Sequence, residues 1–338
     1  YPIRTMSDEL GTISNGAFLA GLDWSAVASE SGYYGSGLSL FFAPFIRYID
    51  DPVLLYRVML LVICLLYGIV ALICFYIMRN IMGMKDNKYC CLVSVTCTYV
   101  VAVRAMVVYN EHMLTVISWM IALLLLKAYQ MVSTGKSNIK VTIMITSILA
   151  YALIVHTRSV IFIASVLAVV LFVRLYYKKW LLSMPVFLFE GILLGGAARY
   201  FNAYMKENIW VNAGTESIRN AEIQTSGVME LLQPRTWHAW GNIILGQIQT
   251  INVLTCGVFL FSCVLFICLL WKCIRNYKLK KIHNLRLGRE GYTFTVGIFC
   301  LVGVGITILG QIATWGVWAT DGMSLGLPSP SYGIKAFT

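Results

Sequence analysis

Long apolar runs recur through this chain, and they constrain its fold more than any other feature. A transmembrane helix needs roughly 20 consecutive apolar residues, and these runs are about that long. They cover residues 53–78, 89–108, 112–130, 140–157, 159–176, 180–200, 243–271 and 292–318. Charged residues make up only 12% of the chain, about half of what soluble domains carry. The sequence therefore predicts an all-α fold, a polytopic transmembrane helix bundle with about eight spans.

The net charge of +11 comes from a few basic loops. The loops lie between alternate spans, at 79–88, 131–140, 177–179 and 272–290, and under the positive-inside rule they face the cytoplasm. The opposite side then carries nearly all the acidic residues: Asp8, Glu9, Asp23, Glu30, Asp50, Asp51, Glu111, Glu207, Glu216, Glu222, Glu230 and Asp321. The basic excess therefore indicates topology, and we expect a protein of the lipid bilayer with no nucleic-acid partner.

The cysteines and histidines give no firm sign of a cofactor. All ten cysteines lie within spans or at their ends, so we interpret them as small apolar packing residues rather than a disulfide framework. His112, His156 and His238 are predicted on the outer side near acidic residues, which leaves a divalent cation as an open alternative. Their spacing matches no recognised set of metal ligands.

The outer segment 1–52 begins with a pair of acidic residues. Asp8 and Glu9 follow Ser7, a suitable helix N-cap, and would occupy the first turn of a helix. The stretch 10–29 is too short and too rich in glycine and serine to cross a bilayer. We therefore expect an interfacial amphipathic helix here.

A second apolar stretch completes this outer segment. A glycine-rich turn over 32–37 leads into residues 38–48, and Asp51-Pro52 closes the segment. Two interfacial segments in one loop indicate a built surface rather than a connector. Because an outer loop has to be carried across the membrane, we expect a helix before it in the full protein, and we interpret 319–338 as an outer loop or a truncated end.

A long outer loop is predicted over residues 201–241, within a single membrane-embedded domain, 1–338. Loops of this length are usually functional or disordered. Trp237 and Trp240, which flank His238 and Ala239, suit an aromatic belt at the membrane interface or a platform for a sugar, and the first alternative is favoured. The sequence contains no internal repeat.

Three outer positions are candidates for chemistry. Asp8 and Glu9 could cap a helix, or could offer a general base to a substrate whose tail stays in the lipid. Glu111 lies in a tight turn with Arg104 about two helical turns before it, which suits an ion pair or a second acid in an outer cavity. Arg158 is a cation on the outer side, so it needs an anionic partner. A phosphate fits a guanidinium well, and a lipid headgroup or an acidic residue of an outer loop is the alternative.

Several of these features resemble the GT-C glycosyltransferases, in particular the protein mannosyltransferase and lipid A aminoarabinose transferase type. The resemblance covers roughly residues 1–174. The elements that carry it are Asp8-Glu9, Tyr34-Gly35-Ser36-Gly37, Pro44, Asp51-Pro52, Asn110-Glu111 and Arg158. Residues 1–338 differ from that family's pattern in two respects: we expect its first transmembrane helix before residue 1, and no segment within 1–338 resembles its C-terminal soluble domain.

The resemblance implies transfer of a sugar from a polyprenyl-phosphate donor to a hydroxyl-bearing acceptor, with inversion, at the outer face of the cell membrane. Asp8 would be the base that deprotonates the acceptor. Glu9 and Glu111 would shape the site or bind a metal ion. Arg158, together with Arg104, would hold the lipid phosphate.

Two other classes of protein are alternatives. A transporter or flippase of a lipid-linked saccharide should carry its key charges at mid-membrane depth, and here only Glu190 lies inside a predicted span. A purely structural membrane subunit would have no outer cavity. The clustering of the other candidates at one interface favours the glycosyltransferase.

Overall fold

The computed structural model describes residues 7–28, 33, 35–102, 107–210, 244, 248–249, 257–278 and 289–321, and every element in these residues is helical. The longer helices are α1 (Ser7–Leu19), α3 (Ser39–Tyr48), α4 (Pro52–Tyr76), α5 (Asn87–Ala102), α6 (Glu111–Ser133), α7 (Ile139–Val155), α8 (Val160–Tyr177), α9 (Met184–Met205), α12 (Val258–Lys278) and α13 (Arg289–Asp321). The short ones are α2 (Ser25–Ala28), the π-helices η1 (Ile77–Ile81) and η3 (Lys206–Trp210), and the 3-10 turn η2 (Thr157–Ser159). The predicted all-α class is confirmed for this part of the chain.

Five helical segments in the described ranges are long and apolar enough to cross a membrane. They are Pro52–Ile81, Glu111–Ser133, Val160–Tyr177, Met184–Ile209 and Glu290–Thr307. Two further apolar helices, Ile139–Val155 and Phe259–Lys272, are shorter. The chain is therefore a membrane protein built as a helix bundle, and the figure of about eight spans stays a prediction.

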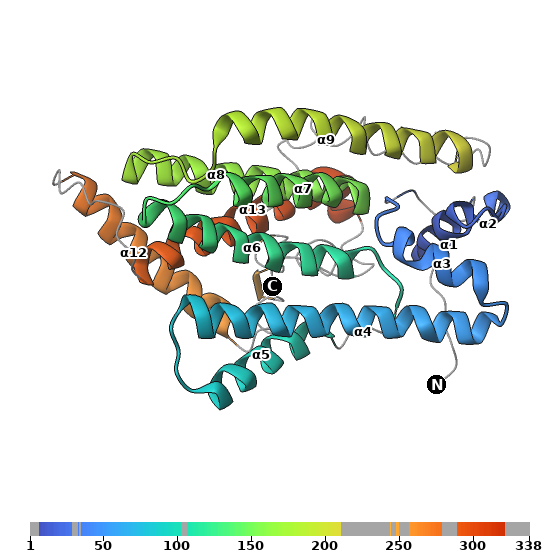
Figure 1. Ribbon diagram of the computed structural model, residues 1–338, viewed down its shortest axis with the longest axis horizontal. Helices are drawn as coiled ribbons and strands as arrows, with labels where there is room; N and C mark the ends of the chain where they lie inside the picture. Colours follow the sequence, from blue (N-terminus) through green and yellow to red (C-terminus); the bar gives the residue numbers. More distant parts are fainter. Residues whose placement is uncertain are drawn as a thin grey trace.

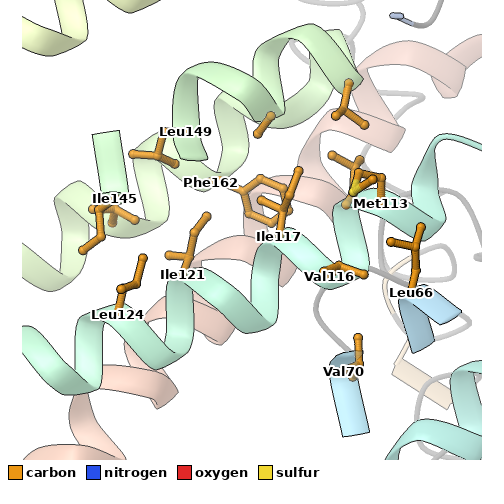
Figure 2. Packing of buried hydrophobic residues seen from close by; sticks show 14 of the residues in the cluster. Leu66, Val70, Met113, Val116, Ile117, Ile121, Leu124, Ile145, Leu149 and Phe162 are labelled. Atoms are coloured by element: carbon orange, nitrogen blue, oxygen red, sulfur yellow. The ribbon is translucent and has the colours of Figure 1, made fainter. Parts of the chain in front are cut away.

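The core of the bundle forms around α6, which packs against α4, α7 and α13. Its side chains over 112–118 are all buried, as are most of those over 121–129, so α6 is enclosed on every side, as expected of a central helix. Figure 2 shows this packing with Leu66 and Val70 of α4, Met113, Val116, Ile117, Ile121 and Leu124 of α6, Ile145 and Leu149 of α7, and Phe162 of α8. Because lipid chains are as apolar as these residues, close packing rather than exclusion of water stabilises this core in a bilayer.

Helices α1, α2 and α3 form a cap at one end of the bundle (Figure 1). Helices α4 and α9 both reach past the ends of α6 and α7, and the cap lies between these two extensions. On one side α3 packs against α4, and on the other α2 packs against η3. Phe18 contacts Tyr204 there, with ring centroids 6.2 Å apart. The cap therefore covers the ends of the central helices.

The structure of the cap differs from the interfacial helices that the sequence predicts. The first helix ends at Leu19, with only the short α2 after it, instead of running over 10–29. Helix α1 is also buried along most of its length, including the polar residues Thr12, Ser14 and Asn15. A helix with buried polar groups on several faces is a packed element, so the prediction of a surface-lying helix was wrong for α1. Helix α3 does expose Phe41 and Tyr48.

Two helix ends also differ from the predicted boundaries. Helix α9 continues through η3 to Trp210, so the loop predicted over 201–241 does not begin at 201. The helix extends because Met205 and Ile209 are buried against the cap residue Ala28. Helix α13 likewise runs to Asp321, and the remaining parts of the two predicted loops, 211–241 and 322–338, lie outside the described residues.

The start of α4 matches its sequence signature. The Asp51 carboxylate accepts hydrogen bonds from the backbone N–H groups of Val53 at 2.8 Å and Leu54 at 3.1 Å, and Pro52 is the first helical residue. Proline is favoured there because its missing N–H would have no partner inside the helix. Asp51-Pro52 therefore opens the helix that links the cap to the bundle.

Candidate functional site beneath the cap

A glycine turn joins the cap to the last turn of α7. The backbone N–H groups of Ser36 and Gly37 donate to the carbonyl of Ile154, at 2.8 and 3.0 Å. Gly35 has φ +129°, and a Cβ built there would lie 2.3 Å from the Val155 carbonyl oxygen. Only glycine allows this conformation and this approach, so the turn expected over 32–37 has a docking role.

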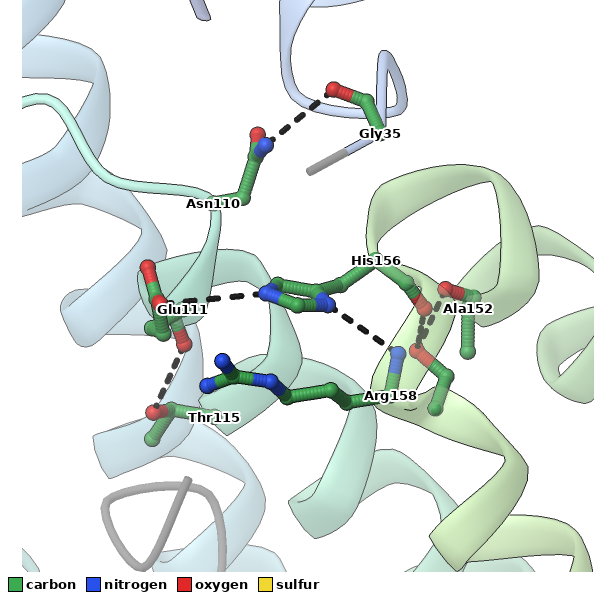
Figure 3. A network of polar contacts seen from close by, with 8 residues as sticks. Gly35, Asn110, Glu111, Thr115, Ala152, His156 and Arg158 are labelled. Carbon is green, nitrogen blue, oxygen red and sulfur yellow. Dashed lines mark hydrogen bonds and ion pairs between the residues drawn. The ribbon is translucent and has the colours of Figure 1, made fainter. Parts of the chain in front are cut away.

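The carbonyl of Gly35 accepts hydrogen bonds from two amide side chains. Asn15 of α1 donates to it at 3.0 Å, and Asn110, just before α6, donates at 3.1 Å (Figure 3). One backbone oxygen thus ties α1, the glycine turn and the start of α6 together. Asn110 is 3% exposed, and its Oδ1 has no hydrogen-bond partner among the described residues.

Glu9 is a buried anchor between the cap and the bundle. Its side chain is fully buried, and its Oε1 accepts hydrogen bonds from the Tyr56 hydroxyl at 2.7 Å and the Val108 backbone N–H at 2.5 Å. Hydrogen bonds to a carboxylate are about twice as strong as neutral ones. Of the two roles that the resemblance implies for Glu9, shaping the site fits these contacts better than binding a metal ion.

Two of the predicted site residues have no described side-chain geometry. Asp8 lies in the first turn of α1 beside Glu9, and the structure describes its backbone only. Arg104 lies outside the described residues, as do Tyr34 of the resemblance and the segment with Trp237, His238 and Trp240. Their predicted roles stay predictions.

Glu111 and Arg158, which are far apart in sequence, are brought together around His156 (Figure 3). Glu111 is the first residue of α6, and its Oε1 lies 4.0 Å from Nε2 of His156. Nδ1 of His156 accepts a hydrogen bond from the backbone N–H of Arg158 at 3.1 Å. The three residues therefore form one polar group beneath the cap, on the turn between α7 and α8 and the start of α6.

His156 is neutral at physiological pH. Burial lowers the pKa of its imidazole from 6.5 to about 3, and the nearby Arg158 charge contributes to this decrease. Because Nδ1 accepts a hydrogen bond, the neutral ring carries its proton on Nε2, the atom that faces Glu111. The 4.0 Å contact is therefore between a neutral N–H and the Glu111 carboxylate, and not an ion pair.

The guanidinium of Arg158 has no hydrogen bond or ion pair to any residue that the structure describes, and its side chain is partly exposed. It extends on the same side of the imidazole as Glu111 in Figure 3. A cation in a partly buried position attracts an anion strongly because solvent screens it less than on an open surface. This arrangement agrees with the anionic partner expected for Arg158.

A second histidine fixes the start of α6 from the other side. The Tyr67 hydroxyl lies 2.5 Å from Nδ1 of His112, and Nε2 of His112 lies 2.9 Å from the carbonyl of Val107. A carbonyl can only accept, so Nε2 donates to it and Nδ1 accepts from Tyr67. His112 therefore has a structural role in holding the segment before Glu111.

No cluster of three or more His, Cys, Asp or Glu side chains in the described part of the chain could hold a metal ion. The divalent cation left open by the sequence therefore gains no support there.

Glu190 of α9 accepts a hydrogen bond from Ser147 of α7 at 3.1 Å, while its Oε2 is buried and has no described partner. It lies on the α7–α9 contact, away from the glycine turn.

Sequence reasoning treated His156 only as a possible metal ligand and did not single out Asn15, Asn110 or Tyr56 as polar anchors. The one available signal was the position of His156 two residues before Arg158 in a predicted outer turn.

Comparisons of the chain with protein families, with curated proteins and with solved structures gave no match.

Proposed function

We propose that this protein is a membrane glycosyltransferase that moves a sugar from a polyprenyl-phosphate carrier to a hydroxyl-bearing acceptor, with inversion, at the outer face of the cell membrane. The observation that carries the proposal is the grouping of the Glu111 carboxylate and the Arg158 cation around one buried imidazole at the capped end of an apolar bundle. A lipid-borne donor suits a bundle of this kind, because its chain can stay in the bilayer while its phosphate reaches the end of the helices.

The proposed reaction divides its charges between two sets of residues. Asp8 takes the proton of the acceptor hydroxyl while the hydroxyl oxygen attacks the anomeric carbon. The bond from that carbon to the phosphate oxygen breaks, and the phosphate leaves with the electron pair. Arg158, together with Arg104, stabilises the negative charge that develops on the phosphate. Glu111 shapes the space between them.

Binding of a polyprenyl monophosphate tests the donor half of the proposal without knowledge of the sugar. This lipid is the product that every donor of the class would release. The full chain in nanodiscs should bind it, as measured by native mass spectrometry, and Arg158→Ala should weaken binding at least tenfold. Arg158→Lys should weaken it less, since the charge remains while the planar fork is lost.

Arg199 of α9, an exposed arginine, provides the matched control. Arg199→Ala removes the same charge from a helix of the bundle and should leave the affinity unchanged. Equal losses in Arg158→Ala and Arg199→Ala would mean that binding follows overall charge, which would remove Arg158 from the proposed site.

Measurements of turnover test the part of the proposal that concerns the acceptor. In the full protein, supplied with a panel of polyprenyl-phosphate sugars and hydroxyl acceptors, Asp8→Asn should lower kcat by about 10²–10⁴-fold, the usual contribution of a general base. Donor binding should stay nearly intact because the substitution preserves size. A parental rate in Asp8→Asn would leave Asp8 as a helix-capping acid and remove the centre of the mechanism.

Glu190 favours one competing function, transport of a lipid-linked saccharide. A carboxyl group inside an apolar helix with one buried, unpaired oxygen is costly unless it serves a substrate or proton path, and Glu190 has this arrangement. Proteoliposomes loaded with a labelled lipid-linked saccharide separate the two functions. Movement across the bilayer that Glu190→Gln abolishes and Asp8→Asn does not affect would favour the transporter.

A further inference from the structure

We infer that His156 is a positioning residue that orients the Glu111 carboxylate with one ring nitrogen and the Arg158 backbone with the other. This inference rests on the proposed function, because it assigns the two oriented groups to one substrate. It gives His156 no contact with the substrate and no proton transfer.

The contacts of the ring point in two directions. Nδ1 accepts from the Arg158 backbone N–H at 3.1 Å, which fixes the turn from which the guanidinium extends. Nε2 faces Glu111 Oε1 at 4.0 Å. That distance is longer than a hydrogen bond, and contacts of this kind often tighten when a substrate binds. One side chain thus spans the gap between α6 and the α7–α8 turn.

The turn around His156 is held from several sides. His156 is extended, with φ −158° and ψ 135°, and it separates α7 from η2. Its backbone N–H donates to the Ala152 carbonyl at 2.9 Å. The Ser159 hydroxyl lies 2.5 Å from the same carbonyl oxygen and 2.6 Å from that of His156. A ring that is 2% exposed on such a turn has little freedom to reorient.

The neutral state of the ring matters for the charges beside it. A protonated His156 would pair with Glu111 and would place a second positive charge next to Arg158. Burial keeps the imidazole neutral, so the ring adds no positive charge beside the Glu111 carboxyl group or the Arg158 guanidinium. His156 can therefore orient both groups without neutralising either.

Two substitutions separate the two contacts. His156→Asn places an acceptor where Nδ1 lies and can cap the Arg158 N–H, but it cannot reach Glu111. His156→Gln can place an N–H near the position of Nε2, but it loses the cap. Both variants are made in the full chain in nanodiscs, and the probes are a polyprenyl monophosphate for affinity and a matched sugar donor for turnover.

We expect each variant to change a different quantity, kcat or affinity, according to which of the two contacts it removes. His156→Asn should lower kcat about tenfold, because it removes the Glu111 contact that we expect to shorten to a hydrogen bond with substrate bound. Its affinity for polyprenyl monophosphate should stay within about twofold of the wild type. His156→Gln should show the opposite pattern, an affinity about five- to tenfold weaker and a kcat near the wild-type value at saturating donor.

Two patterns would overturn the inference, and they are distinguishable. If both variants lose affinity, kcat and thermal stability in parallel, His156 is a structural residue. If neither variant changes, His156 has no positioning role, and in both cases the proposed function stands. If the wild-type chain itself binds no polyprenyl monophosphate and turns over no donor, the proposed function fails and the role of His156 falls with it.

Discussion

At the scale of single residues, the most constrained carboxylate in the described structure is Glu9, which is held by donors from two other segments. Tyr56 and the Val108 N–H both point at the same oxygen in a fully buried position. The neighbouring Asp8 has the catalytic role in our proposal. Under that proposal, Glu9 fixes the cap and Asp8 acts on the substrate.

Glu9→Ala should destabilise the protein strongly. It leaves the Tyr56 hydroxyl and the Val108 N–H without their acceptor, and each buried unsatisfied donor costs about 1–3 kcal/mol. The free energy of unfolding, measured in detergent micelles by denaturant titration, should fall by that sum. Glu207→Ala, at an exposed glutamate of η3, should change it by less than about 0.5 kcal/mol. Equal effects of the two substitutions would contradict the anchor role.

The buried His156 predicts a dependence of stability on pH. Its pKa is about 3 in the folded chain and 6.5 when exposed, so between these values the unfolded chain binds more protons. Stability should therefore fall as the pH falls below 6.5, by up to about 1.4 kcal/mol per pH unit from this group. Unfolding free energies of the wild type and His156→Gln at pH 7 and pH 5 measure the effect. The same decrease in both proteins would contradict it.

At the scale of elements, the glycine turn is the joint between the cap and α7. The sequence could predict a turn at 32–37 and a helix start at Asp51-Pro52 because both signals are local. It could not predict the buried state of Glu9, whose hydrogen-bonded partners lie 47 and 99 residues away. It also could not predict that Glu111, at the start of α6, would face His156, at the end of α7. The periodicity of a helix shows which of its faces is buried, but not which other helix packs against that face.

Gly37→Ala should loosen this joint. An added Cβ would lie 2.3 Å from Cγ2 of Val155 and 2.7 Å from its Cα, so the turn or α7 has to move, and overpacking of this kind costs about 1–3 kcal/mol. The apparent Tm should fall, and amide exchange of the cap should accelerate in mass spectrometry.

Gly68→Ala, in the middle of α4, is the matched control for the turn. The same methyl group meets nothing within 4 Å there, and alanine favours a helix over glycine by about 0.5–1 kcal/mol. Its Tm should stay equal or rise. A fall in Tm for Gly68→Ala as large as for Gly37→Ala would contradict the close approach as the cause.

At the scale of the whole molecule, the cap and the basic loops should lie on opposite sides of the membrane. Lys136, in the loop between α6 and α7, is predicted in the cytoplasm, and Asp50, between α3 and α4, is predicted outside. In a background without the native cysteines, an impermeant maleimide should label Asp50→Cys in intact cells and Lys136→Cys only after lysis. The reverse pattern would invert the topology and the proposed outer active site.

The contacts that hold the cap can form only in a certain order while the protein is being synthesised. The cap leaves the ribosome before α9 does, yet Tyr33 donates a hydrogen bond to Asn202 of α9, 169 residues later. At a synthesis rate of about 5–20 residues per second, the cap waits roughly 10–30 s for that partner. During this interval Glu9 gains Tyr56 and then Val108, which lie 47 and 99 residues after it. The newborn cap therefore acquires its contacts in sequence, first with α4, then with the segment before α6 and last with α9.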